Sequence, residues 1–251
     1  MGKSFLRTSD IAKAAGVHPN TVRMYEGYGY LSPIPRTPKR YRIFTEEHID
    51  QMRLVRTIMK WPYPGGKNLV KSIIKQTARG QLGDALQKTH SYLARVKSEI
   101  ARAEIAAELL EHWASGNASK TATAYLSMRE TAKLLDVTKD ALRNWERNGL
   151  IKVPRNPGNN YRIYGGNEIA RLRVIRTLRM VGYSTMAILR TMLALDKGQK
   201  KDLKKILDTL RPDEDVYYAF DTWQSTLLDK EKRIKNAIQL LETMIAKRKT
   251  A

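Results

Sequence analysis

Two arginines in matching surroundings, Arg23 and Arg143, could bind a polyanion. They lie 120 positions apart (143 − 23), in the segments Val17–Glu26 and Val137–Glu146. A guanidinium group carries its N–H donors in a planar fork, so it can bond a guanine base or a phosphate through two hydrogen bonds. Polar side chains at the start of the same segments could add contacts to base edges: His18, Asn20, Thr21, Thr138 and Lys139. These residue types indicate nucleic-acid recognition rather than bond-making chemistry.

The charge of the whole chain favours the same kind of ligand. Its 251 residues include 46 Lys and Arg against 25 Asp and Glu, a formal net charge of +21, and both halves are basic. Each phosphate that such a protein neutralises releases condensed counterions, which favours binding to a polyanion. Charge alone also fits a ribosomal or generally adhesive basic protein, so the choice depends on the motifs.

Metal, cofactor and enzyme sites are not predicted. The chain has no cysteine, and its four histidines show no ligand spacing. Gly65-Gly66-Lys67 lacks the spacing of a phosphate-binding glycine loop, and no nucleophile elbow or paired carboxylates with a partner base occur. No apolar run follows Lys3 and Arg7 as in a signal peptide, and no window holds the ~18 apolar residues of a membrane helix. We therefore expect a cytoplasmic, nucleoid-associated protein without enzymatic activity, cofactor or membrane partner.

An internal repeat decides the domain organisation. A shift of 120 residues (143 − 23) aligns two long segments without a gap. The identical pairs include Ala12 with Ala132, Val17 with Val137, Arg23 with Arg143, Glu26 with Glu146, Tyr41-Arg42-Ile43 with Tyr161-Arg162-Ile163, and Tyr63 with Tyr183. Chance does not preserve one register across such a length, so the chain is a tandem duplication.

Each copy begins with a predicted helix-turn-helix. A first helix starts near Ser9 or Ser127, where a hydroxyl can cap free N–H groups, and a turn follows at Gly16 or Asp136. The second helices are predicted at Pro19–Glu26 and Lys139–Glu146, with Thr138 as a natural cap and His18 as a poorer one. Two helices joined by so short a turn are typical of DNA-binding proteins.

A predicted wing follows each helix-turn-helix. The Pro-rich stretches Leu31–Arg40 and Ile151–Asn160 lead into alternating β-forming residues, which indicates a two-stranded hairpin. Its candidate contacts to phosphate or to the minor groove are Arg40, Tyr41, Arg42, Tyr161 and Arg162.

Longer helices complete each copy. Apolar spacing predicts a third helix from near Thr45 or Asn167, a fourth at Asn68–Arg79 or Thr185–Leu195, and then a long helix with a coiled-coil seam. The predicted fold is mainly α. Its regions are a winged helix-turn-helix at 1–80, a long helix at 81–115, a linker at 116–124, a second winged helix-turn-helix at 125–198, and a helical connector with the second long helix at 199–251.

These segments resemble the MerR family of bacterial transcription regulators, whose pattern is V-x-x-x-T-L-R-Y-Y-E, then G-L-I, then R-x-Y-R-x-Y. Val17–Glu26 and Val137–Glu146 match its first part, and Gly182-Tyr183-Ser184 matches the G-Y/F-S signature of the fourth helix. The resemblance implies winged helix-turn-helix domains and long helices that pair antiparallel in a homodimer. It also implies binding to a near-palindromic promoter, which family members often bend and untwist.

The resemblance also suggests roles for single residues. Arg23 and Arg143 match the arginine of the recognition helix, and Tyr25 and Trp145 match an aromatic residue that donates to a phosphate. Core packing explains the two aromatic residues equally well. Four further repeated arginines fit a salt-bridge face as well as a phosphate contact: Arg53, Arg56, Arg173 and Arg176.

Three departures from the family shape the prediction. Both copies lie in one chain, so the two long helices could pair within it as an antiparallel coiled coil, giving a monomeric pseudo-dimer rather than a homodimer. We expect no effector domain after either helix, and the cysteines of the family's metal sensors are absent.

We therefore predict a sequence-specific regulator that binds double-stranded DNA, with RNA polymerase at the promoter as a further partner. Because the two recognition helices differ, the expected site is an imperfect inverted repeat with unequal half-sites. Three alternatives stay open. They are an architectural or mobile-element DNA-bending factor, a DNA bridge made by two chains, and a ligand sensor with an apolar pocket near Tyr217, Tyr218, Phe220 and Trp223.

Overall fold

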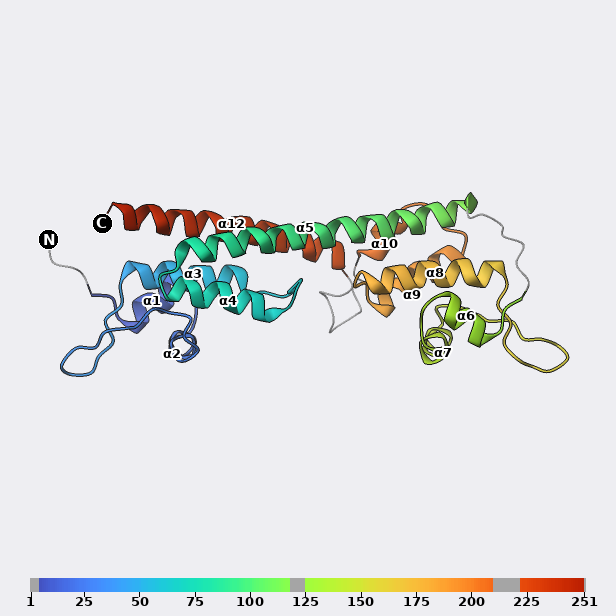
Figure 1. The fold of residues 1–251 in the computed structure, drawn as a ribbon, viewed down its shortest axis with the longest axis horizontal. Helices are drawn as coiled ribbons and strands as arrows, with labels where there is room; N and C mark the ends of the chain where they lie inside the picture. Colours follow the sequence, from blue (N-terminus) through green and yellow to red (C-terminus); the bar gives the residue numbers. More distant parts are fainter. Residues whose placement is uncertain (1–4, 118–124, 210–221, 251) are drawn as a thin grey trace. The chain divides into compact units, whose positions relative to one another are not determined.

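The computed structural model describes residues 5–117, 125–209 and 222–250, which are mainly helical (Figure 1). The chain divides into two compact units, one formed by residues 1–98 with 227–251 and the other by residues 99–226. The long helices α5 (Leu82–His112) and α12 (Trp223–Lys249) each contribute residues to both units. The region boundaries expected from the sequence stay predictions. Most of the expected linker and part of the expected connector, residues 118–124 and 210–221, lie outside the described residues.

The first unit contains the first copy of the repeat. Its helices are α1 (Thr8–Ala15), α2 (Pro19–Gly27), α3 (Glu46–Ile58) and α4 (Lys67–Ala78). α1 packs on α2 and α3 around a core that includes Ile11, Val22, Phe44 and Met52. The turn between α1 and α2 needs a left-handed residue, which Gly16 supplies with φ of 60°.

The second unit repeats this arrangement with α6 (Met128–Leu134), α7 (Lys139–Arg147), α8 (Gly166–Met180) and α9 (Thr185–Asp196). It also contains a π-helical turn (Trp113–Asn117) and the short helix α10 (Leu203–Leu207), which packs on α9. Asp136 takes the left-handed turn position with φ of 48°. Aspartate tolerates this conformation better than most residues, so the turn survives without glycine.

Three of the four predicted helix caps are present, at His18, Ser127 and Thr138, but the cap predicted at Ser9 is wrong, because Ser9 lies inside α1 and Arg7 is the N-cap residue. Thr138 Oγ1 accepts a hydrogen bond from the Ala141 N–H at 3.0 Å, so it caps α7. His18 fills the same role for α2, because its Nδ1 accepts from the Asn20 N–H at 3.2 Å. A polar ring atom thus replaces the hydroxyl in the first copy.

The wings differ from the expected two-stranded hairpins. Each consists of a loop closed by one isolated β-bridge, Arg36 with Arg42 in the first unit and Arg155 with Arg162 in the second. Prolines in both stretches lack an N–H and so cannot extend the ladder. The bridges enclose residues 37–41 and 156–161, so the second loop is one residue longer and the gapless register is wrong inside the wing.

The last helix completes the first unit. Lys230 of α12 is buried, and its Nζ donates to the carbonyl oxygens of Ile58 and Lys60, each at 2.6 Å. The same Nζ lies 5.2 Å and 5.6 Å from the ring centroids of Tyr63 and Tyr92. Burial lowers the pKa of Lys230 to about 8. Carbonyl oxygens and ring faces therefore take the place of water around this ammonium group.

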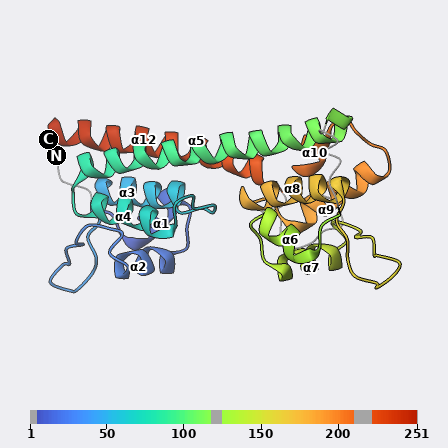
Figure 2. The same ribbon diagram turned by 45° about the vertical axis from the view of Figure 1, so that its right-hand side comes forward.

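The contacts of α12 also give its direction in the first unit. Lys230 meets Tyr92 of α5, whereas Arg248 donates to the carbonyl of Gly80, just before α5 begins, at 2.8 Å. α12 and α5 therefore run in opposite directions here, as both views show (Figures 1 and 2). Coiled-coil pairing over the full length of the two helices stays a prediction.

In the second unit, α5 and the start of α12 meet other groups. Glu104 of α5 accepts hydrogen bonds from Lys204 Nζ at 2.7 Å and from Gln224. These bonds lower the pKa of Glu104, with the Lys204 bond as the largest cause. Trp223 packs against Gly182, where an added Cβ would lie 2.7 Å from the indole ring.

Candidate nucleic-acid interface

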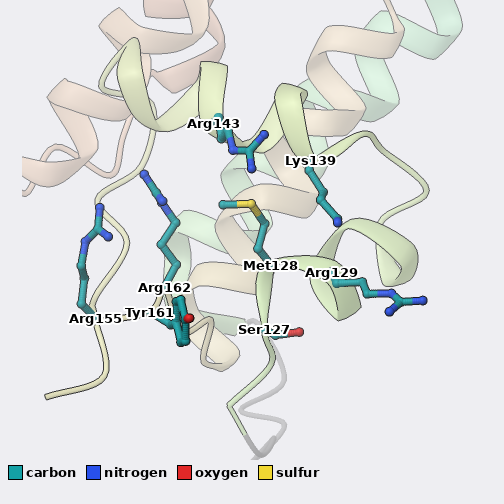
Figure 3. A pocket seen from close by; sticks show the side chains of 8 residues that line it. All are labelled: Ser127, Met128, Arg129, Lys139, Arg143, Arg155, Tyr161 and Arg162. Atoms are coloured by element: carbon teal, nitrogen blue, oxygen red, sulfur yellow. The ribbon is translucent and has the colours of Figure 1, made fainter. Parts of the chain in front are cut away.

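A hollow of about 440 Å³ opens on the second unit between the start of α6, the helix α7 and the wing (Figure 3). Five of its eight lining residues are cations: Arg129, Lys139, Arg143, Arg155 and Arg162. The others are Ser127, Met128 and Tyr161. The lining side chains include no carboxylate, so the opening suits a polyanion such as a nucleic-acid backbone.

An ion pair fixes the wing to α7, the second helix of the helix-turn-helix. Arg162 Nε donates to Glu146 Oε2 at 2.6 Å, and Arg155 Nη2 lies 3.9 Å from Glu146 Oε1. Both guanidinium groups therefore share one carboxylate at the end of α7. Their position at the hollow depends on that carboxylate.

The first unit repeats the arrangement with its own residues. Arg42 Nε donates to Glu26 Oε2 at 2.7 Å, and Arg36 Nη2 lies 3.4 Å from Glu26 Oε1. The side chains of Arg42 and Glu26 are only about a quarter exposed, so solvent screens the pair less than a fully exposed one. Two copies of one geometry indicate a built feature rather than an incidental surface contact.

The predicted arginines of the recognition helices are both exposed and locally bonded. Arg23 Nη1 donates to Asn20 Oδ1 at 3.0 Å, and Arg143 Nη1 donates to Asp140 Oδ1 at 2.7 Å. Each bond joins residues three apart, which lie on one face of the helix. The first copy thus holds its arginine with a neutral amide, and the second holds it with a carboxylate.

The other predicted residues of the recognition helices lie around these arginines. His18 and Asn20 are exposed at the start of α2, and Thr21 is half-buried. Thr138 and Lys139 are exposed at the start of α7, and Lys139 lines the hollow.

The two predicted aromatic contacts lie mainly in the protein interior. Trp145 is 7% exposed, and it is not among the residues that line the hollow. Tyr25 is half-buried against the core of the first unit, and its ring centroid lies 5.7 Å from that of Tyr30. These positions favour the packing role that the sequence also allowed.

The predicted wing residues reach the surface. Tyr41 is 70% exposed and Tyr161 is 73% exposed. Arg40 is exposed with φ of 63°, a conformation that asparagine shares at position 160 in the second wing. The side chains of Arg42 and Arg162 are held in place, because each is paired with a glutamate.

The four further arginines were predicted either as a salt-bridge face or as phosphate contacts, and three of them have local partners. Arg53 Nη1 lies 3.5 Å from Asp50 Oδ1, and Arg176 Nη2 lies 3.3 Å from Asp136 Oδ2. Arg56 donates to the carbonyl oxygen of Ala15. For Arg53 and Arg176 the contacts resemble the salt-bridge face that the sequence left open, whereas Arg56 bonds to a backbone carbonyl.

Sequence reasoning missed several residues of the interface. Glu26 and Glu146 carried a signal, because each stands 16 residues before its wing arginine (42 − 26 and 162 − 146). Arg155 carried another, since Arg36-x-Pro38 recurs as Arg155-x-Pro157 at a shift of 119 rather than 120 (155 − 36). Arg129 had no counterpart to reveal it, because Ser9 stands at the matching position.

Comparisons with known proteins bear on the same segments. The family described as MerR HTH family regulatory protein matches residues 6–60 and again residues 126–195. Both copies are MerR-type helix-turn-helix domains. The MerR-type segments contain α1, α2 and α3 in the first unit and α6 to α9 in the second.

Curated relatives are named as regulators. A probable heavy metal-dependent transcriptional regulator of Haemophilus influenzae is 33% identical over 81 residues, which cover 32% of this chain and 62% of the relative. The HTH-type transcriptional regulator CueR of Escherichia coli O6:H1 is 33% identical over 51 residues, which cover 20% of this chain and 38% of the relative. The mercuric resistance operon regulatory protein of Bacillus cereus is 29% identical over 94 residues, which cover 35% of this chain and 71% of the relative.

The chain therefore spans less than two thirds of the length of the first two of these relatives. No solved structure matches the chain significantly. Within residues 5–117, 125–209 and 222–250, no helix has the length and apolar character needed to cross a membrane. The same residues contain no group of three or more His, Asp or Glu side chains placed to hold a metal ion.

Proposed function

We propose that this MerR-type chain is a transcription regulator that binds double-stranded DNA through both of its helix-turn-helix units. The observation that carries the proposal is the cation-lined hollow between α6, α7 and the wing, together with the repeated glutamate–arginine pairs that position both wings. A recognition helix in the major groove, with a wing on the adjacent backbone, would use these cations on base edges and phosphates. The regulators among the relatives agree with such a role.

The two units should prefer different half-sites. At the start of the recognition helix, His18-Pro19-Asn20 in one unit corresponds to Thr138-Lys139-Asp140 in the other. An amide both donates and accepts hydrogen bonds, whereas a carboxylate only accepts, so the two helices can favour different bases. The wing loops also differ by one residue in length. The expected target is an imperfect inverted repeat.

One chain could then do what two subunits do in a homodimer. Pairing of the two long helices within the chain would present both units to one duplex as a monomeric pseudo-dimer. By the family resemblance, the complex would distort promoter DNA and act on RNA polymerase there. The alternative ligand pocket lies mostly at residues 217–220, outside the described residues, so only Trp223 of that cluster can be placed.

Selection from a random duplex library tests this function. The unaltered chain should enrich an inverted repeat with two unequal halves. Arg23→Ala should erase the preference in one half and Arg143→Ala in the other, each weakening specific binding by roughly tenfold or more, because a good bidentate contact is worth about 1–3 kcal/mol. Weak, salt-sensitive binding with no enriched sequence would instead indicate an architectural DNA-binding protein.

A further inference from the structure

A second cationic hollow, of about 350 Å³, lies in the first unit away from the wing. Its lining residues come from the end of α1, from α3 and from α12: Ala14, Ala15, Arg53, Arg56, Thr57 and Arg233. Three guanidinium groups thus share one opening, and the last of them comes from the C-terminal helix. This grouping exists only when α12 is in place on the first unit.

The carboxylates beside this hollow do not balance its arginines. Asp50 lies 3.5 Å from Arg53, but it also holds Lys247 at 2.7 Å. Asp229 holds Arg233 at 2.7 Å and lies 4.0 Å from Lys60. Two carboxylates therefore face five cations, counting Arg56. Arg56 itself has no ion pair with any residue in the described parts of the chain.

The second unit has a carboxylate that the first unit lacks at the matching position. Its matching arginine, Arg176, is paired with the carboxylate of Asp136 at 3.3 Å. In the first unit, the residue at that turn position is Gly16, and Arg56 Nη1 lies 2.8 Å from where a Cβ of residue 16 would stand. Both turn residues are left-handed, with φ of 60° and 48°. One copy of the repeat supplies a carboxylate to this arginine, whereas in the other copy Arg56 bonds only to the neutral carbonyl oxygen of Ala15 in the described parts of the chain.

We infer that the hollow lined by Arg53, Arg56 and Arg233 binds a phosphate-bearing ligand. Guanidinium forks match the oxygen geometry of phosphate, and charge-assisted bonds of this kind are the strong ones. A hollow of about 350 Å³ has the volume of a small-ligand site. The phosphate would stand where Asp136 stands in the second unit. Because Arg233 belongs to α12, occupancy would also strengthen the attachment of that helix to the first unit. The site does not depend on the function proposed above.

Titration of the full chain with inorganic phosphate, followed by amide NMR at constant ionic strength, tests the site. The amides of Ala15, Gly16 and Thr57 should shift in a saturable way. Gly16→Asp should weaken this binding by roughly tenfold or more, because it supplies the missing carboxylate, and Asp136 shows that the turn accepts aspartate. Arg233→Gln should weaken it similarly and serves if the first variant fails to fold.

Two matched controls separate the site from general charge effects. Gly29→Asp adds the same charge at another left-handed glycine of the first unit, where nothing lies within 4 Å of a Cβ, and should leave the shifts unchanged. Arg173→Gln removes the counterpart of Arg53 in the second unit and should also leave them unchanged. The inference is overturned if the three amides do not shift, or if Gly16→Asp and Arg233→Gln bind phosphate as Gly29→Asp does.

The source of the phosphate follows from salt dependence. If the phosphate belongs to bound DNA, Arg53→Gln should reduce the slope of log affinity against log salt by about one relative to the unaltered chain. An unchanged slope, with phosphate binding still lost, would point to a small phosphorylated ligand. Either result keeps the site, because both require the three arginines to bind phosphate.

Discussion

Arg162 Nε donates to Glu146 Oε2 across 2.6 Å, and the duplicated pair in the first unit, Arg42 and Glu26, is 2.7 Å apart. A carboxylate at a surface that we propose binds DNA weakens the attraction to phosphate, so its presence in both copies needs a reason. The geometry gives one, since each glutamate holds two arginines of a wing against the recognition helix. We attribute specificity, rather than affinity, to these glutamates.

Glu146→Gln separates these two effects. Removal of a negative charge should keep or raise affinity for a random duplex, whereas a freed wing should lower affinity for the selected site. The ratio of specific to non-specific affinity should fall by roughly tenfold, the effect of about 1.4 kcal/mol. Titrations of both duplexes at one salt concentration measure it, with Glu168→Gln, outside the wing, as the control. An unchanged ratio would refute the positioning role.

Gly182 should tolerate no side chain. Its φ of 108° is a backbone conformation that strains any residue with a side chain. A Cβ would also lie 2.7 Å from the ring of Trp223, so alanine would clash with that ring. Gly198→Ala is the matched control, because its φ is 87° and nothing lies within 4 Å. Urea unfolding should show a loss of about 1 kcal/mol for the control and clearly more for Gly182→Ala. Equal losses would mean that Trp223 does not pack there.

Lys230→Met should destabilise the first unit. Methionine fills a similar volume but leaves the carbonyl oxygens of Ile58 and Lys60 without their donor. The expected loss is about 2 kcal/mol in the free energy of unfolding, measured with urea. Lys232→Met, on an exposed position of the same helix, should change stability little. A loss no greater than that of the control would show that the buried ammonium group contributes nothing.

His48 predicts a pH dependence of stability. Burial is the largest cause of its lowered pKa, so the folded chain keeps the ring neutral where the unfolded chain protonates it. The unfolded value is about 6.5, so the contribution of His48 to stability should be constant above that pH and fall as pH drops through the interval down to the folded pKa.

Comparison with His48→Gln isolates this contribution. The variant removes the titrating ring, while the matching position of the second copy, Glu168, shows that a longer polar chain can cap this helix, with Oε2 accepting from the Gly165 N–H at 2.9 Å. Between about pH 7.5 and about pH 5, the unaltered chain should lose more unfolding free energy than the variant. Parallel pH profiles for the two proteins would rule out His48 as the cause.

Much of this structure was predictable from the sequence, because it depends on local rules. The repeat, the caps at Thr138 and the turns at Gly16 and Asp136 follow from residue types at short spacing, and the structure contains them. The bounds of α2, α4, α7 and α9 differ from the predicted ones by at most one residue, and α5 ends three residues before the predicted end of the first long helix.

What the sequence left open depends on contacts between distant residues. Each wing has one bridge rather than a hairpin because prolines interrupt the hydrogen-bond ladder. The second loop has one more residue because a surface loop tolerates an insertion. Lys230 is part of a helical pattern in the sequence. No neighbouring residue indicates that its ammonium group donates to the carbonyl oxygen of Lys60, 170 positions earlier (230 − 60). Trp145 shows the same limit, since its interior position follows from the packing of the whole unit.

The mass of the complex with the selected duplex tests the central claim most directly. If one chain presents two unequal reading units to one site, native mass spectrometry should find one 28.7 kDa chain on each duplex. Exchange of either half-site for a random sequence should then weaken binding without changing that ratio. Two chains on each duplex would contradict the pseudo-dimer. Each chain would then bind the site through only one of its two helix-turn-helix units.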